Sequence, residues 1–431
     1  TKMTRNILHC DMNNFYASVE CMLSPELKQY PVAVCGSVEE RHGIVLAKNY
    51  KAKAFKVATG DAVWQAKQKC PDLVVVPPHY EEYLKYSKLA KAIYCNYTNQ
   101  VEPYGMDKCW LDISGTKKLF GNPVDVANEI RERIKFELGL TISVGVSFNK
   151  IFAKLGSDYK KPDAVTVFEK ETFREKIWGL PASDLLGVGR ATTRVLNNYC
   201  IRTIGDLANS DYDFIKRILG KNGVSLWLYA NGRDNSTVKD IKFVSPVKSI
   251  GHGITTVVDL SNEEEVWRVF LELTQGIGHK LRVHQKVAKA VAIYVRDNTL
   301  FSKQWQTQMQ MVTQSPLVLA QYAFQLFKKR YDWRNPIRSV TIQAINLFPQ
   351  DMPQQIDLFC DYERAEKQEK LDGCVEKLRQ RFGKRCIRNA VLLQELGMPM
   401  GNVEITMPGI FLGSLDAPYQ NAGKVRNRGW E

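Results

Sequence analysis

Apolar strand-like runs and amphipathic helical runs alternate up to residue 168, and this alternation limits the folds open to the chain. Residues 6–11 form an apolar run that ends in Asp11, and residues 13–22 have the spacing of a helix with one apolar face. Further strands are predicted at 73–76, 100–104, 108–113 and 141–147, with helices near 80–98 and 124–138. Helices and strands that alternate around one sheet predict an α+β domain of the ferredoxin-like kind.

The pattern changes at several points along the chain, which predicts several domains. Residues 23–79 form a small α+β segment, in which residues 52–70 are predicted to be largely helical and basic. Short helices broken at glycines follow, then a polar linker, and strands again frame two helices after residue 243. The sequence therefore predicts an α+β multidomain protein with one helical unit inside it.

The chain is basic, with 60 Lys and Arg against 46 Asp and Glu and a formal net charge of +14. Such a charge implies attraction to a polyanion, either nucleic acid or an acidic membrane surface. Residues 242–347 hold about twice as many basic as acidic side chains, as a DNA-binding module would, although a merely basic solvated surface is the plainer alternative.

Other features of the composition bear on location. The sequence contains neither an apolar run long enough to span a membrane nor an N-terminal signal sequence, so we expect a cytoplasmic protein without a membrane partner. The ten cysteines contain no C-x-x-C pair, which favours reduced core residues over a zinc site or disulfides.

Two short segments place acidic residues at the ends of predicted strands. Asp11 begins the run DMNNFY, and Asp107 lies in the run YGMDKCWLD, where a turn leads into a strand. A carboxylate that projects from a sheet edge is suited to hold a divalent cation. For Asp11 alone, an N-cap of the following helix is the plainer interpretation.

Taken together, these two segments resemble the palm of the Y-family (translesion) DNA polymerases, whose pattern is D-x-D/N-x-F-F/Y-A followed by S-x-D-E-x-x-x-D. Residues 49–53 (NYKAK) are similar to the family's N/S-Y-x-A-R, and residues 147–162 match S-x-N-K-x-x-A-K-x-x-S-x-x-x-K-P across its whole spacing. The resemblance is to the bacterial DNA polymerase IV branch. It implies a right-hand polymerase with a ferredoxin-like palm (1–22 and 80–168), small fingers (23–79), a helix-hairpin-helix thumb (169–232), a linker (233–242), an α+β little finger (243–348) and a C-terminal tail (349–431).

The resemblance also implies the chemistry, which is template-directed incorporation of dNTPs opposite damaged bases by two-metal phosphoryl transfer. Two Mg²⁺ ions, for which Mn²⁺ can substitute, would be held by Asp11, Asp107 and the backbone carbonyl of Met12. Tyr16 matches the steric gate that excludes a ribose 2′-hydroxyl, with an ordinary core aromatic as the plainer alternative. The residues implied in nucleotide binding are Phe15, Tyr16, Tyr50, Lys53 and Lys161, of which Lys53 replaces an arginine and so loses the bidentate fork.

The departure from the family pattern is Lys108, which stands where the pattern has a metal-binding glutamate. An ammonium cannot coordinate magnesium, and it places positive charge close to the ion. Whether the lysine is natural or introduced, we expect a strong catalytic defect. By strand alternation Asp112 lies on the same face as Lys108 and could pair with the ammonium, but we do not expect it to replace the glutamate as a metal ligand.

Further segments imply contacts with DNA and with a sliding clamp. Gly187 and Gly189 lie in the run LGVGR, similar to the hairpin through which backbone N–H groups approach a phosphate. Residues near 248 and 335–340 resemble the little finger's edge strands, so that Lys248, Arg296 and Arg338 would follow phosphates. The run QIDLF matches the clamp-binding peptide, with Gln355, Leu358 and Phe359 as anchors, although a local packing strand is the alternative.

Three hypotheses follow from these motifs. The first is a Y-family DNA polymerase, expected as a monomer that binds primer-template DNA, dNTP and the clamp. The second is a non-catalytic DNA- and clamp-binding protein, in which Lys108 has ended the chemistry. A two-metal nuclease or a nucleotide cyclase on a similar sheet is disfavoured by the thumb hairpin and the clamp peptide.

Overall fold

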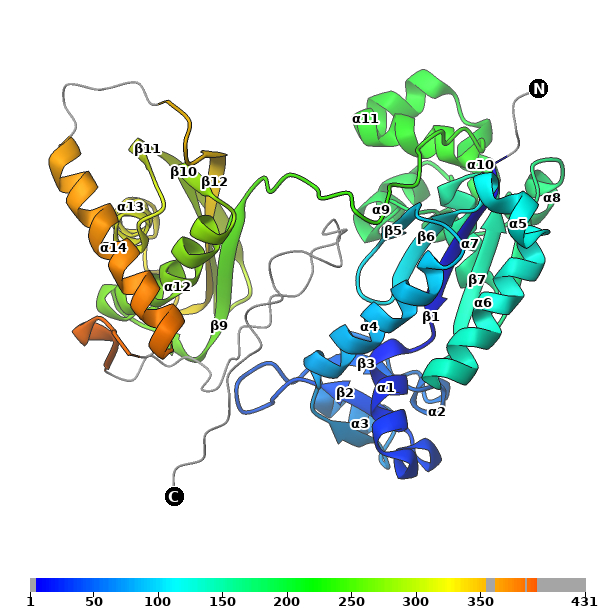
Figure 1. The fold of residues 1–431 in the computed structure, drawn as a ribbon, viewed down its shortest axis with the longest axis horizontal. Helices are drawn as coiled ribbons and strands as arrows, with labels where there is room; N and C mark the ends of the chain where they lie inside the picture. Colours follow the sequence, from blue (N-terminus) through cyan, green and yellow to red (C-terminus); the bar gives the residue numbers. More distant parts are fainter. Residues whose placement is uncertain (1–4, 354–360, 384–385, 394–431) are drawn as a thin grey trace. The chain divides into compact units, whose positions relative to one another are not determined.

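The computed structural model describes residues 5–353, 361–383 and 386–393 (Figure 1). The described residues form two compact units, one made of residues 5–36 and 44–245 and the other of residues 37–43 together with the described residues from 246 onward. Each unit has its own sheet and its own buried apolar core. Within the described residues, no helix is both long enough and apolar enough to cross a lipid bilayer.

A five-stranded sheet forms the centre of the first unit, with strand order β5-β6-β1-β7-β8. The central strand β1 (Ile7–Met12) runs antiparallel to both neighbours, β6 (Lys108–Asp112) and β7 (Ile142–Ser147). The outer strands are β5 (Val101–Pro103) and β8 (Val165–Phe168). Every residue of β1 is buried, because helices cover both faces of the sheet.

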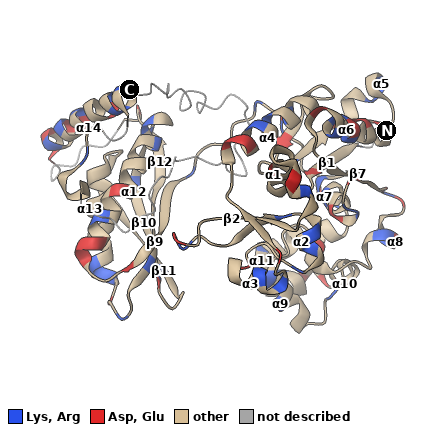
Figure 2. Cartoon of the chain, turned by 90° about the horizontal axis from the view of Figure 1, so that it is seen from below, with Lys and Arg blue, Asp and Glu red and all other residues tan. Residues whose placement is uncertain are grey.

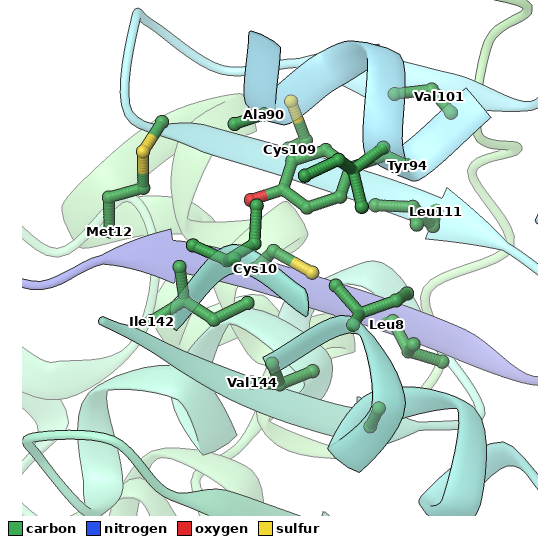
Figure 3. Packing of buried hydrophobic residues seen from close by; sticks show 14 of the residues in the cluster. Leu8, Cys10, Met12, Ala90, Tyr94, Val101, Cys109, Leu111, Ile142 and Val144 are labelled. Atoms are coloured by element: carbon green, nitrogen blue, oxygen red, sulfur yellow. The ribbon is translucent and has the colours of Figure 1, made fainter. Parts of the chain in front are cut away.

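One face of this sheet packs against α1 (Phe15–Leu23), α4 (Tyr80–Cys95) and α6 (Pro123–Leu138). Cys10 and Cys109 are cross-strand partners in this layer and lie beside Tyr94 of α4 (Figure 3). On the opposite face, Ile7 and Trp110 pack against Ala153 of α7 (Lys150–Tyr159). Alternation along β1 therefore sends successive side chains into two different cores.

A smaller sheet of three strands, in the order β3-β2-β4, follows α1 in the chain. It contains β2 (Val32–Cys35), β3 (Val45–Lys48) and β4 (Val74–Val76), with the helices α2 (Tyr50–Ala54) and α3 (Val63–Lys69) between the last two. Both helices carry lysines, coloured blue in Figure 2. Residues 52–70, predicted to be largely helical, contain the end of α2 and all of α3, and the backbone between them turns through left-handed conformations at Lys56 (φ 61°) and Gly60 (φ 92°).

A helical segment with its own core follows the five-stranded sheet. Its helices are α8 (Phe173–Ile177), α9 (Arg190–Asn198), α10 (Ile204–Asn209) and α11 (Tyr212–Ala230), and α11 is kinked at Gly220, where φ is 62°. Phe152 and Leu155 of α7 belong to the same core, so this segment is anchored to the sheet through α7. A short helix, α5 (Lys117–Phe120), lies between β6 and α6.

The second unit contains a four-stranded antiparallel sheet with the order β11-β10-β12-β9. Its strands are β9 (Ile250–Leu260), β10 (Lys286–Asp297), β11 (Ser302–Thr313) and β12 (Ile337–Pro349), and α12 (Glu263–Val283) and α13 (Pro316–Arg330) pack on one face (Figure 1). On the other face, Arg296 lies between Ser302 and Ser339 on the neighbouring strands.

A further helix, α14 (Tyr362–Phe382), is attached to the second unit through polar side chains. Glu376 accepts from the ring of His279 on α12, Glu369 pairs with Arg282 at 3.4 Å, and Arg379 donates to the Gln275 side chain at 2.7 Å. None of the side chains of α14 is fully buried. The attachment therefore rests on charge and hydrogen bonding and not on a shared apolar core.

Most of the predicted elements are confirmed by the structure. The strands expected at 100–104, 108–113 and 141–147 are present as β5, β6 and β7, and the helices expected near 80–98 and 124–138 are α4 and α6. The expected α+β multidomain architecture, with a helical segment between two α/β parts, is confirmed as well.

Candidate active site

The register of β1 and β6 brings the two predicted carboxylates together. Asp11 is the cross-strand partner of Lys108, so Asp107, one residue earlier, lies at the same edge of the sheet. The backbone N–H of Met12 donates to the carbonyl of Asp107 over 3.0 Å and fixes the two chain segments against each other. Asp11 belongs to a strand and the N-cap of α1 is Asn14, so the alternative of Asp11 as a helix cap is wrong.

The turn that carries Asp107 is held from behind by α4. Gly105 takes a φ of 86°, a conformation that glycine adopts without steric cost. The Ser87 hydroxyl of α4 donates to the carbonyl of Met106, and the Lys91 ammonium donates to Ser87 over 3.0 Å. Both side chains are buried, so this chain of hydrogen bonds fixes the backbone that precedes Asp107.

The ammonium of Lys108 lies between the two carboxylates. It pairs directly with Asp107, and its Nζ is 3.4 Å from Asp11 Oδ1. Burial by itself lowers the pKa of Lys108, but the carboxylates of Asp107 and Asp11 outweigh burial and raise it above its ordinary value. Lys108 therefore remains a cation at any physiological pH. The pairing with Asp112 that strand alternation allowed is wrong, because four residues along a strand separate side chains by roughly 13 Å.

Lys161 reaches the Asp11 carboxylate from the segment after α7. Its Nζ lies 2.7 Å from Asp11 Oδ2 and 2.8 Å from Asp158 Oδ1. The backbone N–H of Asp163 donates to Asn13 Oδ1 over 3.0 Å, which ties this segment to the end of β1. Burial raises the pKa of Asp11, and the ammonium groups of Lys108 and Lys161 offset part of that increase.

The carboxylates at this edge of the sheet are metal-type donors that already have cationic partners. Magnesium prefers oxygen ligands such as the carboxylates of Asp11 and Asp107. Both oxygens of Asp11 and one of Asp107, however, are paired with ammonium groups. Among the described residues, no group of three or more His, Cys, Asp and Glu side chains is placed to hold a metal ion. In this arrangement Asp11 and Asp107 are neutralised by the ammonium groups of Lys108 and Lys161, and a metal can bind only after the ion pairs of Lys108 open.

Tyr16, the predicted steric gate, lies on α1 one turn beyond the carboxylates. Its ring stacks on that of Tyr83 with centroids 4.2 Å apart and planes 9° apart, and the Phe15 ring is 5.7 Å away. Burial raises the pKa of Tyr16 to about 12, so its hydroxyl stays protonated. The ring is only partly buried, unlike that of Phe15, which belongs to the core.

The two residues predicted from the NYKAK run lie on α2. Tyr50 is half-buried, and burial raises its pKa, while Lys161 and Asp11 are near enough to act on it electrostatically. Lys53 is exposed, with its Nζ 5.5 Å from the centre of the Tyr50 ring. The structure thus brings Tyr50 to the lysine–carboxylate cluster, with Lys53 beside Tyr50.

The hairpin glycines precede α9. Gly187 has a φ of 96°, and a Cβ there would lie 3.1 Å from a Leu226 methyl, whereas a Cβ at Gly189 would meet nothing within 4 Å. Gly189 is the N-cap of α9, so the backbone N–H groups that follow it start a helix. Only Gly187 therefore requires glycine for backbone reasons.

The remaining predicted DNA contacts belong to the second unit. Arg296 and Lys248 are exposed. Arg338 is the extra residue of a β-bulge, because Arg296 pairs with Ser339 and Asp297 pairs with Ile337. The bulge explains why Arg338 and Ser339 are both half-exposed between the buried Ile337 and Val340. Gln355, Leu358 and Phe359 of the predicted clamp peptide lie outside the described residues.

Sequence reasoning missed several residues of the site. Asp158 pairs with Lys161, and Asn13 positions the segment that carries Lys161. Asn13 occupies the D/N position of the D-x-D/N pattern, which was the available signal. Burial by itself raises the pKa of Asp158, but Lys154 and Lys161 hold it down at about 2.

A sheet with two carboxylates at one edge, a small second sheet, a helical segment and a separate α/β unit are the parts of a right-hand DNA polymerase. A solved Y-family DNA polymerase chimera has the same fold, with a TM-score of 0.71 at 21% identity, over 80% of this chain and 99% of that one. The model of the impB/mucB/samB family matches residues 10–158, and the model of its C-terminal domain matches residues 247–358. The chain belongs to this family of Y-family DNA polymerases.

Two relatives named DNA polymerase IV match most of this chain. The chain is 50% identical to DNA polymerase IV of Acetivibrio thermocellus over 396 residues, which cover 92% of this chain and 99% of the relative. It is 36% identical to DNA polymerase IV 1 of Bacillus subtilis, over 91% of this chain and 94% of the relative. The similarity thus extends over nearly the whole length of both relatives.

Proposed function

We propose that this chain is a translesion DNA polymerase of the polymerase IV type, one that incorporates dNTPs opposite damaged bases and whose chemical step is slowed by Lys108. Membership of the family and the relatives named DNA polymerase IV support the activity. The slowed chemical step is inferred from the position of the Lys108 ammonium, which lies between Asp11 and Asp107. A cation at that position neutralises the carboxylates that the family chemistry uses.

Mg²⁺ is the ion we propose for this chemistry, with Mn²⁺ able to substitute. When bound, such ions activate the attacking hydroxyl and neutralise the triphosphate. Asp11, Asp107 and the carbonyl of Met12 are the proposed ligands, and Lys108 must leave Asp11 and Asp107 before either carboxylate can bind a metal. The site of this chain is therefore set for nucleotide and DNA binding more than for reaction.

The nucleotide contacts are proposed from the cluster around Asp11. Lys161 and Tyr50 approach the carboxylates, and Lys53 lies beside the Tyr50 ring, as expected for groups that meet a triphosphate. Phe15 and Tyr16 follow on α1, and we propose that the half-buried Tyr16 ring contacts the sugar.

DNA is proposed to contact both units. The backbone near Gly187 and Gly189 would approach one phosphate, and Lys248, Arg296 and Arg338 would follow others, because these cations hold position without reading sequence. The open face of the second sheet presents Arg296, with Arg338 turned outward by the bulge. A sliding clamp is proposed as a partner through residues 355–359, and the protein is proposed to act as a cytoplasmic monomer.

Primer extension in magnesium tests the proposal by comparing the parent chain with Lys108→Glu. Restoring a carboxylate supplies several kcal/mol of charge stabilisation, so Lys108→Glu should extend at least about a hundredfold faster. Lys108→Met is the matched control, because it removes the positive charge without supplying a ligand, and it should remain slow. Equal and vigorous extension by the parent and Lys108→Glu would contradict the role of Lys108, and extension by neither would contradict a polymerase.

The alternative function is a DNA- and clamp-binding protein without catalysis, and the ion pairs of Lys108 favour it over a nuclease or cyclase. Both functions predict salt-sensitive binding of primer-template, and only the polymerase predicts extension. Deleting residues 355–359 should abolish clamp-stimulated synthesis by Lys108→Glu while leaving unaided DNA binding unchanged. Unchanged stimulation would reject the clamp peptide.

A further inference from the structure

The ring of Tyr16 contacts a network of side chains, buried at Tyr83 and Glu20, that the proposed function does not use. Tyr16 stacks on Tyr83 of α4, and Tyr80 meets both rings edge-on, with centroids 6.1 Å from Tyr16 and 5.8 Å from Tyr83. Tyr83 is 0% exposed, so its ring cannot move without disturbing the core. The half-buried Tyr16 ring therefore lies on a fixed aromatic surface.

The hydroxyl of Tyr83 is anchored in turn by Glu20. It donates to Glu20 Oε1, and the same carboxylate accepts from the backbone N–H of His79 at 3.3 Å and lies 2.9 Å from His79 Nδ1. Glu20 is 4% exposed, and a carboxylate so deeply buried is tolerated because it has these partners. His79 is the N-cap of α4, so the Glu20 carboxylate also meets the positive end of that helix.

Two side-chain contacts join the same faces of α1 and α4. Tyr16 and Glu20 are four residues apart on α1 and so lie on one face of it. His79 and Tyr83 have the same spacing at the start of α4. The ring contact and the carboxylate contact thus join the same two helix faces, and a change in one shifts the other.

We propose that Glu20, Tyr83 and His79 position the Tyr16 ring and thereby set how strongly the chain discriminates deoxyribonucleoside from ribonucleoside triphosphates. The inference rests on the proposed role of Tyr16 as the steric gate. A gate excludes a hydroxyl group by volume, so a ring that tilts by a fraction of its thickness admits the larger sugar. Glu20, Tyr83 and His79 are positioning residues, because they act through Tyr16.

Discrimination between the two kinds of triphosphate can be measured directly by nucleotide binding to the full-length chain. A primer-template with a dideoxy-terminated primer is titrated with dATP and with ATP in magnesium. The Kd for ATP divided by the Kd for dATP gives the discrimination ratio, which is compared among variants. Tyr83→Phe keeps the stacked ring and removes its anchor, and the ratio should fall about tenfold, which corresponds to about 1.4 kcal/mol. Glu20→Gln keeps a hydrogen-bond acceptor, and the ratio should fall less.

Tyr86→Phe is the matched control, because it removes one tyrosine hydroxyl from the same helix outside the network. It should keep the parent ratio. A merely structural weakening of the site would raise both Kd values together and leave the ratio unchanged, so the ratio isolates positioning from stability. The thermal unfolding of each variant is measured alongside.

The outcomes separate the inference from the proposed function. If Tyr16→Ala abolishes discrimination while Tyr83→Phe and Glu20→Gln keep the parent ratio, the positioning network is rejected and the gate stands. If the parent chain binds dATP and ATP equally, or Tyr16→Ala leaves the ratio unchanged, the gate assignment fails and the network loses its role with it.

Discussion

Replacing Lys108 by glutamate should make the stability of the first unit depend on magnesium. The ammonium is 3.4 Å from Asp11 Oδ1 and also pairs with Asp107. Two unit charges about 4 Å apart interact by about 4 kcal/mol at an effective dielectric constant of about 20. The side chains of Lys108 and Asp107 are 26% and 27% exposed, so we take about half of that value for each pair.

Loss of both attractions gives a cost of about 4 kcal/mol, within the range of about 3–5 kcal/mol for removing one partner of a buried ion pair. For a unit of this size, the unfolding midpoint of Lys108→Glu in EDTA should fall by about 8–16 °C. A metal bound at 100 times its Kd restores about 2.7 kcal/mol, so magnesium should recover most of the loss. The parent chain should respond weakly, because its own ammonium groups occupy the carboxylates.

Differential scanning fluorimetry with EDTA and with stepped magnesium measures both quantities without reference to catalysis. Lys85→Glu is the control, because the Lys85–Glu82 pair is exposed and contributes about 1 kcal/mol at most. A Lys108→Glu chain that is as stable as the parent in EDTA would refute the electrostatic reasoning. An equal response of both chains to magnesium would show that Lys108 does not compete with the ion.

Three further predictions concern other parts of the molecule. The pKa of Asp158 is held at about 2, so the stability that its carboxylate contributes is present above about pH 4 and is lost as the pH falls toward 2. The free energy of unfolding of Asp158→Asn should therefore fall less over that pH range than that of the parent, and identical pH dependence would contradict the shift. Gly187→Ala should cost about 1–2 kcal/mol in urea unfolding because φ is 96°, whereas Gly189→Ala should cost under about 0.5 kcal/mol; equal costs would remove the backbone argument. Arg296→Ala should lower the salt dependence of DNA binding by about one unit of slope, with Lys370→Ala unchanged, and equal slopes would place DNA elsewhere.

The parts of the fold and site that sequence predicted are those with local signals. Residues 6–11 are apolar and end in a carboxylate, which was enough to predict β1, whereas Asp11 was singled out only together with the Asp107 segment, by their resemblance to the Y-family palm. The spacing of the 147–162 run likewise singled out Lys161, whose ammonium lies beside Asp11. These predictions depend only on the order and spacing of residues within short segments of the chain.

The parts that sequence could not predict depend on contacts between distant segments. The partner of Lys108 follows from the register of β6 against β1, and strand alternation alone led to Asp112. The break between α2 and α3 is set by a left-handed turn at Lys56, a residue type that gives no warning of that conformation. The Glu20–Tyr83 contact joins residues on two helices, and a buried glutamate is rare enough that the sequence around Glu20 gives no signal for it.

The polar attachment of α14 has a consequence for how this chain can change over evolutionary time. The apolar core of the second unit is formed by residues between Ile250 and Ala344, and α14 adds charge pairs on its outside. A helix attached in this way can lengthen, diverge or be deleted without opening a cavity behind it. Its retention in a lineage would then reflect selection on what its outer face meets, and substitutions there would accumulate independently of the core of the second unit.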